Sequence, residues 1–167
     1  MRLAKSYTIY WVLLLLSIAL LGIALLFEHI KGLIPCPLCI SQRFIFGIIG
    51  FLSFIVILFR PGGTKLRAFG LLVFIFSLLG LALAYRQIYL EHLPASASRV
   101  CLPGLEYLIQ IMPWQEILKT MFVGSPECGV VHWTFLGFSM AVWLVPVFVF
   151  IAVIGLIEIV RKHDIIE

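Results

Sequence analysis

Long apolar runs dominate the chain, and polar residues gather in short stretches between them. Four runs have about the 20 residues that an α-helix needs to cross the hydrocarbon core of a membrane. They cover residues 9–27, 40–59, 66–85 and 138–160. A transmembrane β-barrel would instead show alternating segments of about ten residues, and the sequence has no such pattern. The pattern therefore predicts an all-α membrane protein with a bundle of four transmembrane helices.

The composition supports a membrane protein and excludes an ordinary soluble domain. Of the 167 residues, 63% are hydrophobic and 12% are charged, whereas a soluble domain has about 25% charged residues. The first run follows Arg2 and Lys5 and so resembles a secretory signal peptide. However, its apolar stretch continues to Phe27, which is long for a signal sequence, so we expect a retained first helix. The whole chain is then one membrane domain.

Basic residues near the helix ends predict the orientation of the bundle. Most fall on the side that holds both termini, and the positive-inside rule places that side in the cytoplasm. These residues are Arg2, Lys5, Arg60, Lys65, Arg67, Arg161 and Lys162. The opposite side contains two outer loops, about 28–39 and 86–134. The sequence pI of about 9.0 is then mainly an orientation signal, and no nucleic-acid-binding module accompanies it.

The second outer loop contains an amphipathic segment, residues 105–122. Apolar residues recur there at i, i+3, i+4 and i+7 in two sets, which Pro113 separates. This spacing predicts a short interfacial helix along the membrane surface, with Trp114 near the lipid headgroups. Packing on the ends of the membrane helices fits the same pattern equally well.

All four cysteines fall on the predicted outer side, where disulfide bonds form and persist. Cys36 and Cys39 end the first outer loop, and Cys101 and Cys128 lie in the second. Four cysteines allow three pairings, and the spacing does not choose among them. The second pair lacks the C-x-x-C spacing of a zinc knuckle, so we expect no metal site. Thiol–disulfide exchange could pass oxidising equivalents between two such pairs.

The stretch PCPLCISQR, residues 35–43, combines thiols with a charge beside a predicted span. Pro37 suits the first position of a helix, where its missing N–H has no partner to lose. We therefore expect Cys36 near the N-cap and Cys39 in the first turn, where unpaired N–H groups and the helix dipole favour the reactive thiolate. Arg43 lies on the same face as Cys39, about 6 Å deeper. Because such a charge is costly in lipid, we expect it to stabilise the thiolate, to bind a carbonyl-bearing ligand, or both.

These motifs and the topology resemble the DsbB family, the bacterial inner-membrane proteins of disulfide bond formation. CPLCISQR is similar to the C-x-x-C-x-x-x-R signature of that family. The number of spans, the short first outer loop and the long second loop with two cysteines also agree. YRQIYLEHLP before Cys101 and ECGVVHWTFLGFSM around Cys128 are similar to family sequences as well. The resemblance covers nearly the whole chain.

The resemblance implies an enzyme that reoxidises DsbA, a periplasmic thioredoxin-like dithiol protein, and passes the electrons to ubiquinone or menaquinone. By match, the thiolate of DsbA would attack Cys101, and the released Cys128 would attack Cys36. Cys39 would be left as a thiolate facing the quinone, and Arg43 would stabilise both the thiolate and the quinone oxygen. The quinone would supply the redox chemistry, while the protein supplies position and electrostatics.

One position departs from the family pattern. Some members have a histidine near the quinone shortly after the third span, and counting back from Leu93-Pro94 places Gln87 in that register. Gln87 can donate a hydrogen bond to a quinone oxygen but cannot carry a proton charge at neutral pH. We therefore expect Gln87 to contribute to quinone binding, and His92 to be an ordinary interfacial residue.

Two other classes account for part of the pattern. Vitamin K epoxide reductase-like proteins are also thiol–quinone membrane bundles, but their C-x-x-C lies near the end of the core, whereas here it opens the second span. A tetraspan structural or adhesion protein, with Cys101 and Cys128 stapling the outer loop, needs no catalysis. Such a staple would stabilise the fold by about 3–4 kcal/mol. This second class leaves Arg43 beside Cys39 without a role.

Overall fold

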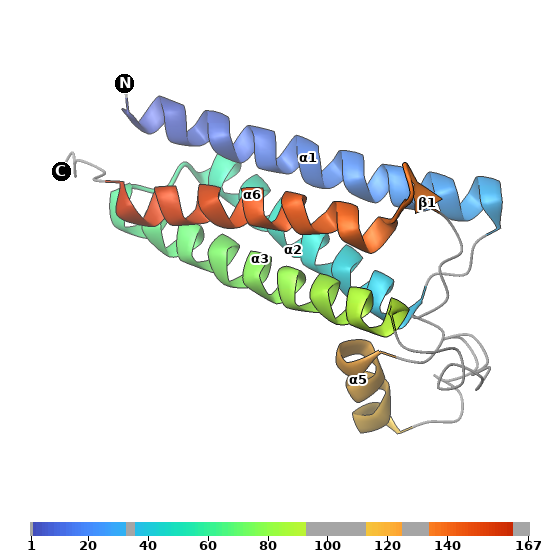
Figure 1. Ribbon diagram of the computed structural model, residues 1–167. Coiled ribbons are helices and arrows are strands. Elements are labelled where there is room, and N and C mark those ends of the chain that lie inside the picture. Colours follow the sequence, from blue (N-terminus) through green and yellow to red (C-terminus); the bar gives the residue numbers. More distant parts are fainter. Residues whose placement is uncertain (1, 33–35, 93–112, 125–133, 162–167) are drawn as a thin grey trace.

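The computed structural model describes residues 2–32, 36–92, 113–124 and 134–161 (Figure 1). Four long helices run side by side in it, and each is long and apolar enough to cross a membrane. They are α1 (Arg2–Lys31), α2 (Pro37–Phe59), α3 (Gly63–Glu91) and α6 (Met140–Val160). The predicted all-α bundle of four membrane-spanning helices is therefore confirmed.

The last long helix begins at Met140 rather than at residue 138, because a small hairpin precedes it. Strands β1 (Thr134–Phe135) and β2 (Phe138–Ser139) pair antiparallel, with Phe135 opposite Phe138. Leu136 and Gly137 connect them with φ of 54° and 82°. Two successive left-handed residues match the turn that favours tight hairpins. The sequence did not predict this hairpin, since Leu-Gly is not one of the dipeptides that usually signal it.

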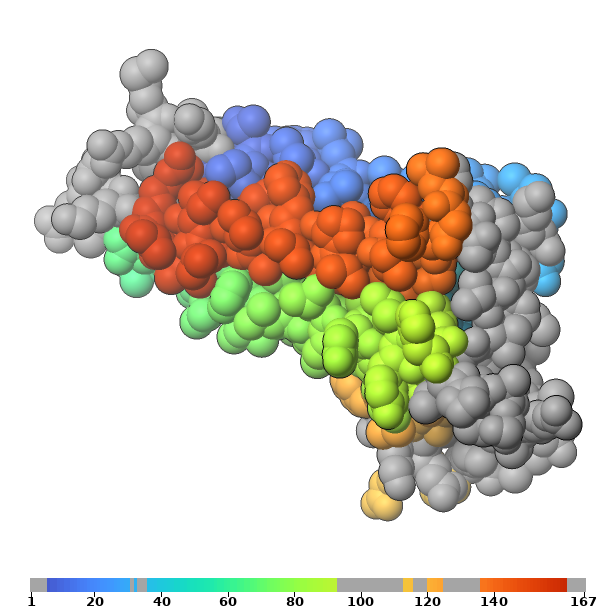
Figure 2. Space-filling view, viewed as in Figure 1, coloured from blue at the N-terminus to red at the C-terminus, as the bar shows by residue number. Residues whose placement is uncertain are grey.

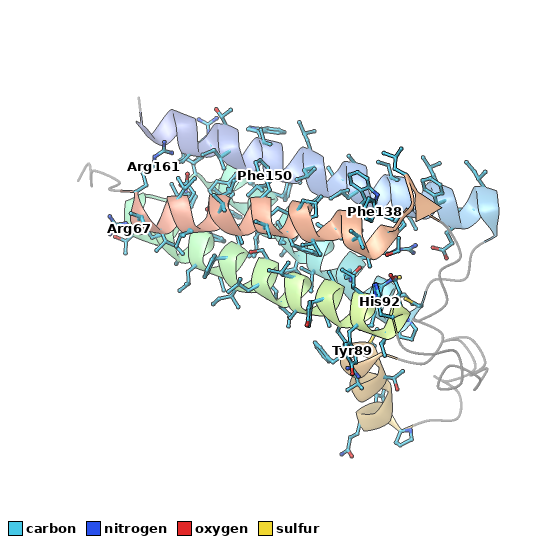
Figure 3. All side chains as sticks on the ribbon, viewed as in Figure 1. Arg67, Tyr89, His92, Phe138, Phe150 and Arg161 are labelled. Carbon is cyan, nitrogen blue, oxygen red and sulfur yellow. The ribbon has the colours of Figure 1, made fainter. Side chains whose placement is uncertain are left out.

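The outer surface of the bundle is apolar along the four helices. Phe51 is 63% exposed and Phe59 is 73% exposed, and Phe150 projects outward from α6 (Figure 3). In Figure 2, one face of the molecule is formed by α1, α6 and α3, with α6 between the other two. An apolar surface of this extent would drive aggregation in water, whereas lipid tails cover it in a bilayer. The chain is thus a multi-pass membrane protein.

Small residues allow α3 and α6 to pack closely. A Cβ atom on Gly155 would lie 2.9 Å from the backbone nitrogen of Phe74 and 3.0 Å from the carbonyl oxygen of Gly70. At Gly80 a Cβ atom would overlap the ring of Phe148, at 2.2 Å. Glycine at these positions lets the two helices approach in a way that larger residues would prevent.

A buried polar cluster joins the helices at the end where α1 begins and α6 ends (Figure 1). Glu158, only 1% exposed, accepts hydrogen bonds of 3.2 Å from Ser6 Oγ and from Arg161 Nη1. Arg67 of α3 donates to the carbonyl oxygen of Arg161 at 3.2 Å. Arg67 and Arg161 therefore mark one end of the bundle, and Tyr89 and His92 mark the opposite end (Figure 3). We call the latter the cysteine end, because α2 begins there, with Cys36 as its N-cap residue.

The short helix α5 (Trp114–Val123) packs on the cysteine end through its C-terminal residues. Ser41 Oγ of α2 donates to the carbonyl oxygen of Met121 at 2.9 Å. Arg86 Nε of α3 donates to the carbonyl oxygen of Val123 at 3.1 Å. The predicted short helix of the second loop is therefore confirmed over Trp114–Val123, and its end contacts the membrane helices. The first half of the predicted segment, residues 105–112, lies outside the described residues.

Candidate functional site

The first turn of α2 has the geometry that its sequence predicted. Cys36 is the N-cap residue, with an extended backbone, and Pro37 occupies the first helical position. Cys36 Sγ accepts a hydrogen bond of 3.3 Å from the backbone N–H of Cys39. The two sulfur atoms lie 2.7 Å apart, so only a small movement separates them from the S–S distance of about 2.05 Å in a disulfide. The two thiols are thus close enough to form a disulfide.

Gln87, near the end of α3, brings its side-chain amide against Cys39. Gln87 is 6% exposed, and its Nε2 lies 3.5 Å from Cys39 Sγ, with Oε1 at 3.8 Å. These two residues are distant in the sequence, and the antiparallel packing of α2 and α3 places them at the same depth. A polar N–H group therefore lies beside the sulfur that the sequence selected as the thiolate.

Arg43 turns toward α1. Its Nη1 forms an ion pair with Glu28 Oε2, and its Nη2 donates to the carbonyl oxygen of Ala24 at 3.4 Å. The Arg43 and Glu28 side chains are 25% and 35% exposed. The charge that the sequence placed inside a span thus has a counter-charge, which removes most of the cost of burying it.

Two residues of this region were not predicted to belong to the site. Glu28 is one, and its position relative to Arg43 offered a signal: opposite charges lie at a similar depth in consecutive antiparallel spans. Gln42 is the other; it is 2% exposed, and its Nε2 donates to Gln87 Oε1 at 3.3 Å. Its i+3 spacing from Cys39 places both residues on one face of α2, but the contact with Gln87 depends on how α2 and α3 pack.

The structure describes only some of the remaining predicted residues. Cys101 and Cys128 lie outside the described residues. His92 is exposed and follows the last turn of α3, with its Nδ1 2.8 Å from the carbonyl oxygen of Ile88. Within the described ranges, no group of three or more His, Cys, Asp and Glu side chains could hold a metal ion.

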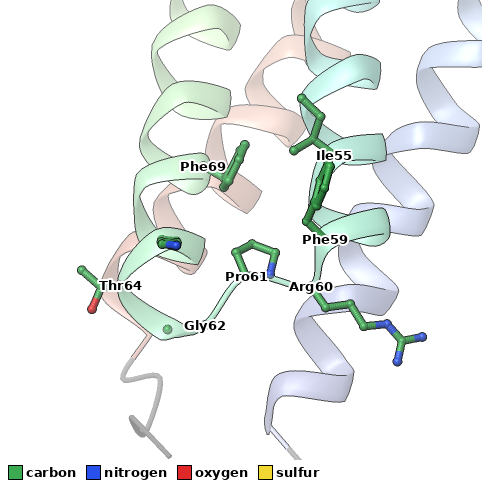
Figure 4. Close-up of a pocket in the computed structure, with 9 residues that line it drawn as sticks. Ile55, Phe59, Arg60, Pro61, Gly62, Thr64 and Phe69 are labelled. Carbon is green, nitrogen blue, oxygen red and sulfur yellow. The ribbon is translucent and has the colours of Figure 1, made fainter. Parts of the chain in front are cut away.

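A cavity of about 710 Å³ lies far from the cysteines, at the turn between α2 and α3 (Figure 4). Its lining includes Phe59, Arg60 and Phe69, and it contains none of the predicted site residues. The predicted site residues that the structure describes therefore lie at the opposite end, the cysteine end, where α2 supplies Cys36, Cys39 and Arg43, α3 supplies Gln87 and α1 supplies Glu28.

Comparison with known proteins agrees with the geometry of this site. The family model described as "Disulfide bond formation protein DsbB" matches residues 6–157. Disulfide bond formation protein B of Marinobacter nauticus is 38% identical over 159 residues, which are 95% of each chain. The protein of the same name from Stutzerimonas stutzeri is 36% identical over 162 residues, 97% of this chain and 99% of the relative. That of Hahella chejuensis is 39% identical over 142 residues, 85% and 86% of the two chains. The similarity covers nearly the whole chain, and the structure places a thiol pair at the end of a four-helix membrane bundle. The chain therefore belongs to the DsbB family of disulfide bond formation proteins.

Proposed function

We propose that this membrane oxidoreductase reoxidises a periplasmic DsbA-type dithiol protein and passes the electrons to a membrane quinone. The observation that carries the proposal is the pair Cys36 and Cys39, whose sulfur atoms lie 2.7 Å apart at the start of a membrane-spanning helix. Soluble thiols can reach this end of the helix, and so can a lipid-soluble acceptor. Membership of the DsbB family supports both halves of the reaction.

The residues around Cys39 fit a quinone headgroup. A quinone presents carbonyl oxygens, which gain negative charge on reduction and need hydrogen-bond donors. The amide of Gln87 offers one donor beside the sulfur. The guanidinium of Arg43 uses Nη1 and Nη2 for its contacts with α1, and it has further N–H groups to offer. A bound ubiquinone or menaquinone would supply the two-electron acceptor chemistry, and the chain would supply the thiolate and these donors.

The four cysteines carry the exchange in this proposal, starting from a Cys101–Cys128 and a Cys36–Cys39 disulfide. A partner thiolate attacks Cys101, forms a mixed disulfide and releases Cys128 as a thiolate. Cys128 then attacks Cys36, which breaks the bond to Cys39 and leaves Cys39 as a thiolate. The second thiolate of the partner attacks the mixed disulfide, which releases Cys101 and leaves the partner as a disulfide. Each step forms one disulfide and breaks one, so two reduced sulfurs, Cys39 and Cys101, remain, and their reoxidation needs a two-electron acceptor. The helix N-terminus and the amide of Gln87 favour the negative charge on Cys39.

The proposal also includes an orientation in the bacterial inner membrane. Four basic residues lie at the end of the bundle opposite the cysteines. Arg60 is the C-cap residue of α2, Lys65 lies in the first turn of α3, and Arg67 and Arg161 mark the same end (Figure 3). We assign that end, with both termini, to the cytoplasm, because basic residues flank membrane helices mainly on that side. The cysteine end then faces the periplasm, where disulfides persist.

Quinone reduction by the purified protein in detergent tests the proposed function. A reduced periplasmic thioredoxin-like dithiol protein is the electron donor, and ubiquinone and menaquinone are each tried as acceptor. We expect turnover in the wild type, no turnover in Cys39→Ala, and a rate lower by about tenfold or more in Arg43→Ala, since charge-assisted hydrogen bonds contribute roughly 1.5–3 kcal/mol.

Ser53→Ala is the control for this assay. Ser53 is buried in α2, and its hydroxyl donates to the Ile49 carbonyl of its own helix at 2.8 Å. We expect this variant to turn over at the wild-type rate. If neither quinone is reduced with any of several dithiol donors, the proposal is wrong, and the outer cysteines are better explained as structural disulfides.

A further inference from the structure

We infer that Gln42 is a positioning residue, which orients the amide of Gln87 so that its N–H faces the sulfur of Cys39. Because this inference rests on the proposed function only through the Cys39 thiolate, it can be tested without quinone or partner protein. Neither the motif C-x-x-C-x-x-x-R nor the register that selected Gln87 points to Gln42.

The three side chains form one chain of contacts between α2 and α3. Gln42 Nε2 donates to Gln87 Oε1 at 3.3 Å, and Gln87 Nε2 lies 3.5 Å from Cys39 Sγ. Gln42 is 2% exposed and Gln87 is 6% exposed. Cys39 and Gln42 are on one face of α2, since they are three residues apart. Gln87 reaches both of them from α3.

The direction of these hydrogen bonds decides the effect on the sulfur. A glutamine side chain has a donor NH₂ and an acceptor oxygen, and rotation of the amide exchanges them. A thiolate is stabilised by a facing N–H and repelled by a facing oxygen. Gln42 donates to Oε1 of Gln87, which fixes the rotation of the amide so that Nε2 lies 3.5 Å from Cys39 Sγ and Oε1 lies 3.8 Å from it. Oε1 accepts from the Cys39 thiol while that thiol is protonated, and Nε2 is the atom that can donate to the thiolate. Both amides are buried, and a reversed Gln87 would lose this hydrogen bond at a cost in free energy.

Charged and titratable groups also lie at the cysteine end. On α2 they are Cys36, which contacts Cys39 directly, and Arg43, and on α1 Glu28, which is paired with Arg43. On α3 they are Arg86, which donates to the Val123 carbonyl of α5, and His92, whose Nδ1 lies 2.8 Å from the Ile88 carbonyl oxygen. None of the described side chains of α5 carries a charge. Replacing Gln42 by an uncharged residue leaves these groups in place, so a change at Cys39 can be assigned to the amide of Gln87.

The test measures how the reactivity of Cys39 depends on pH. Cys36, Cys101 and Cys128 are replaced by alanine in the full chain, so that Cys39 is the remaining thiol, and its alkylation by iodoacetamide is followed from acid to alkaline pH. We expect Gln42→Met to move the midpoint of the alkylation profile about one pH unit higher. On the acid side, a shift of that size lowers the thiolate fraction, and with it the alkylation rate, about tenfold. The rate at the alkaline plateau, where all of Cys39 is thiolate, should stay the same.

A double substitution separates positioning from a direct effect. Gln87→Met alone should shift the profile in the same direction, and Gln42→Met added to Gln87→Met should shift it no further. The inference is overturned if Gln42→Met leaves the profile of the protein with Cys39 as its remaining thiol unchanged. It is also overturned if Gln42→Met shifts the profile as far in the presence of Gln87→Met as it does alone. Gln42→Asn, whose amide is too short to reach Gln87, should reproduce the shift and replaces Gln42→Met if that variant does not fold.

Gln115→Met is the matched control. Gln115 is an exposed glutamine of α5, so the same chemical change there should leave the alkylation profile unaltered. The quinone assay is run on the four-cysteine protein and can fail while the alkylation profiles behave as expected, or the reverse. The two outcomes therefore distinguish the positioning role of Gln42 from the proposed electron path.

Discussion

Arg43 shows how a charge is accommodated inside an apolar helix. Both of its described partners belong to α1: the carboxylate of Glu28 and the carbonyl oxygen of Ala24. A guanidinium left without a partner at this depth would cost free energy, and so would the carboxylate alone. The ion pair therefore connects α1 to α2 at the cysteine end and keeps Arg43 close to the turn that carries Cys39.

Removing one member of this pair should cost more than removing both. Glu28→Leu leaves Arg43 without its counter-charge, so we expect the melting temperature in detergent to fall by roughly 2–4 °C, which corresponds to about 1 kcal/mol in a chain of this size. In Glu28→Leu/Arg43→Met no charge is left to compensate, and the melting temperature should recover most of the loss. Thermal unfolding followed by circular dichroism measures both. A double variant less stable than Glu28→Leu would contradict the expectation that Arg43 without its counter-charge destabilises the fold.

The contact of α3 with α6 depends on glycines that place backbone against backbone. Gly155 meets the backbone of Phe74 and Gly70, with no room for a side chain. Phe148 of the same helix stacks on Phe46 of α2, with ring centroids 4.6 Å apart, and lies over Gly80. Because α6 also reaches α1 through Glu158 and Ser6, its fit against α3 affects the whole bundle.

Gly155→Val tests this packing at the scale of the helix. The added side chain overlaps backbone atoms, and overpacking of this kind costs about 1–3 kcal/mol. We expect a melting temperature lower by several degrees in detergent. Gly22→Val is the matched control, because nothing lies within 4 Å of a Cβ atom on Gly22 of α1, and valine has the same helix propensity in both places. Equal melting temperatures for the two variants would rule out close packing at Gly155.

The whole molecule is polar at its two ends and apolar between them. One end carries Arg67, Arg161 and the buried Glu158, and the other carries the thiols with their amide and guanidinium neighbours. In the proposed function, a soluble thiol delivers electrons on the side where the cysteine end is exposed. The proposed orientation is therefore part of the proposed function.

Reporter fusions test this orientation. An alkaline phosphatase fused after the last residue of the chain should be inactive in bacteria, because both termini are assigned to the cytoplasm and the enzyme needs periplasmic disulfides. The same enzyme fused after His92, at the cysteine end, should be active. The reverse pattern of activity would exclude the orientation, and with it the transfer of electrons from a periplasmic partner.

Much of the element-level structure could be predicted from the sequence because it depends on local chemistry. Four apolar runs of membrane-spanning length predict four helices whatever their neighbours are. Pro37 and the preceding Cys36 predict where α2 begins, since proline is tolerated at the first helical position. The spacing of Cys39 and Arg43 places them on one face of α2 for the same reason, as helix periodicity needs no tertiary contact.

Contacts between helices were decided by the tertiary structure. That Arg43 meets Glu28, and that Gln42 reaches Gln87 beside Cys39, depends on the depth and rotation of three helices relative to one another. Hydropathy constrains neither quantity, because a lipid-facing and a helix-facing residue can be equally apolar in a membrane. The sequence by itself thus determined the helices, the thiols and the charge beside them. Only packing decided which polar groups surround the thiol, because those partners come from helices far apart in the chain.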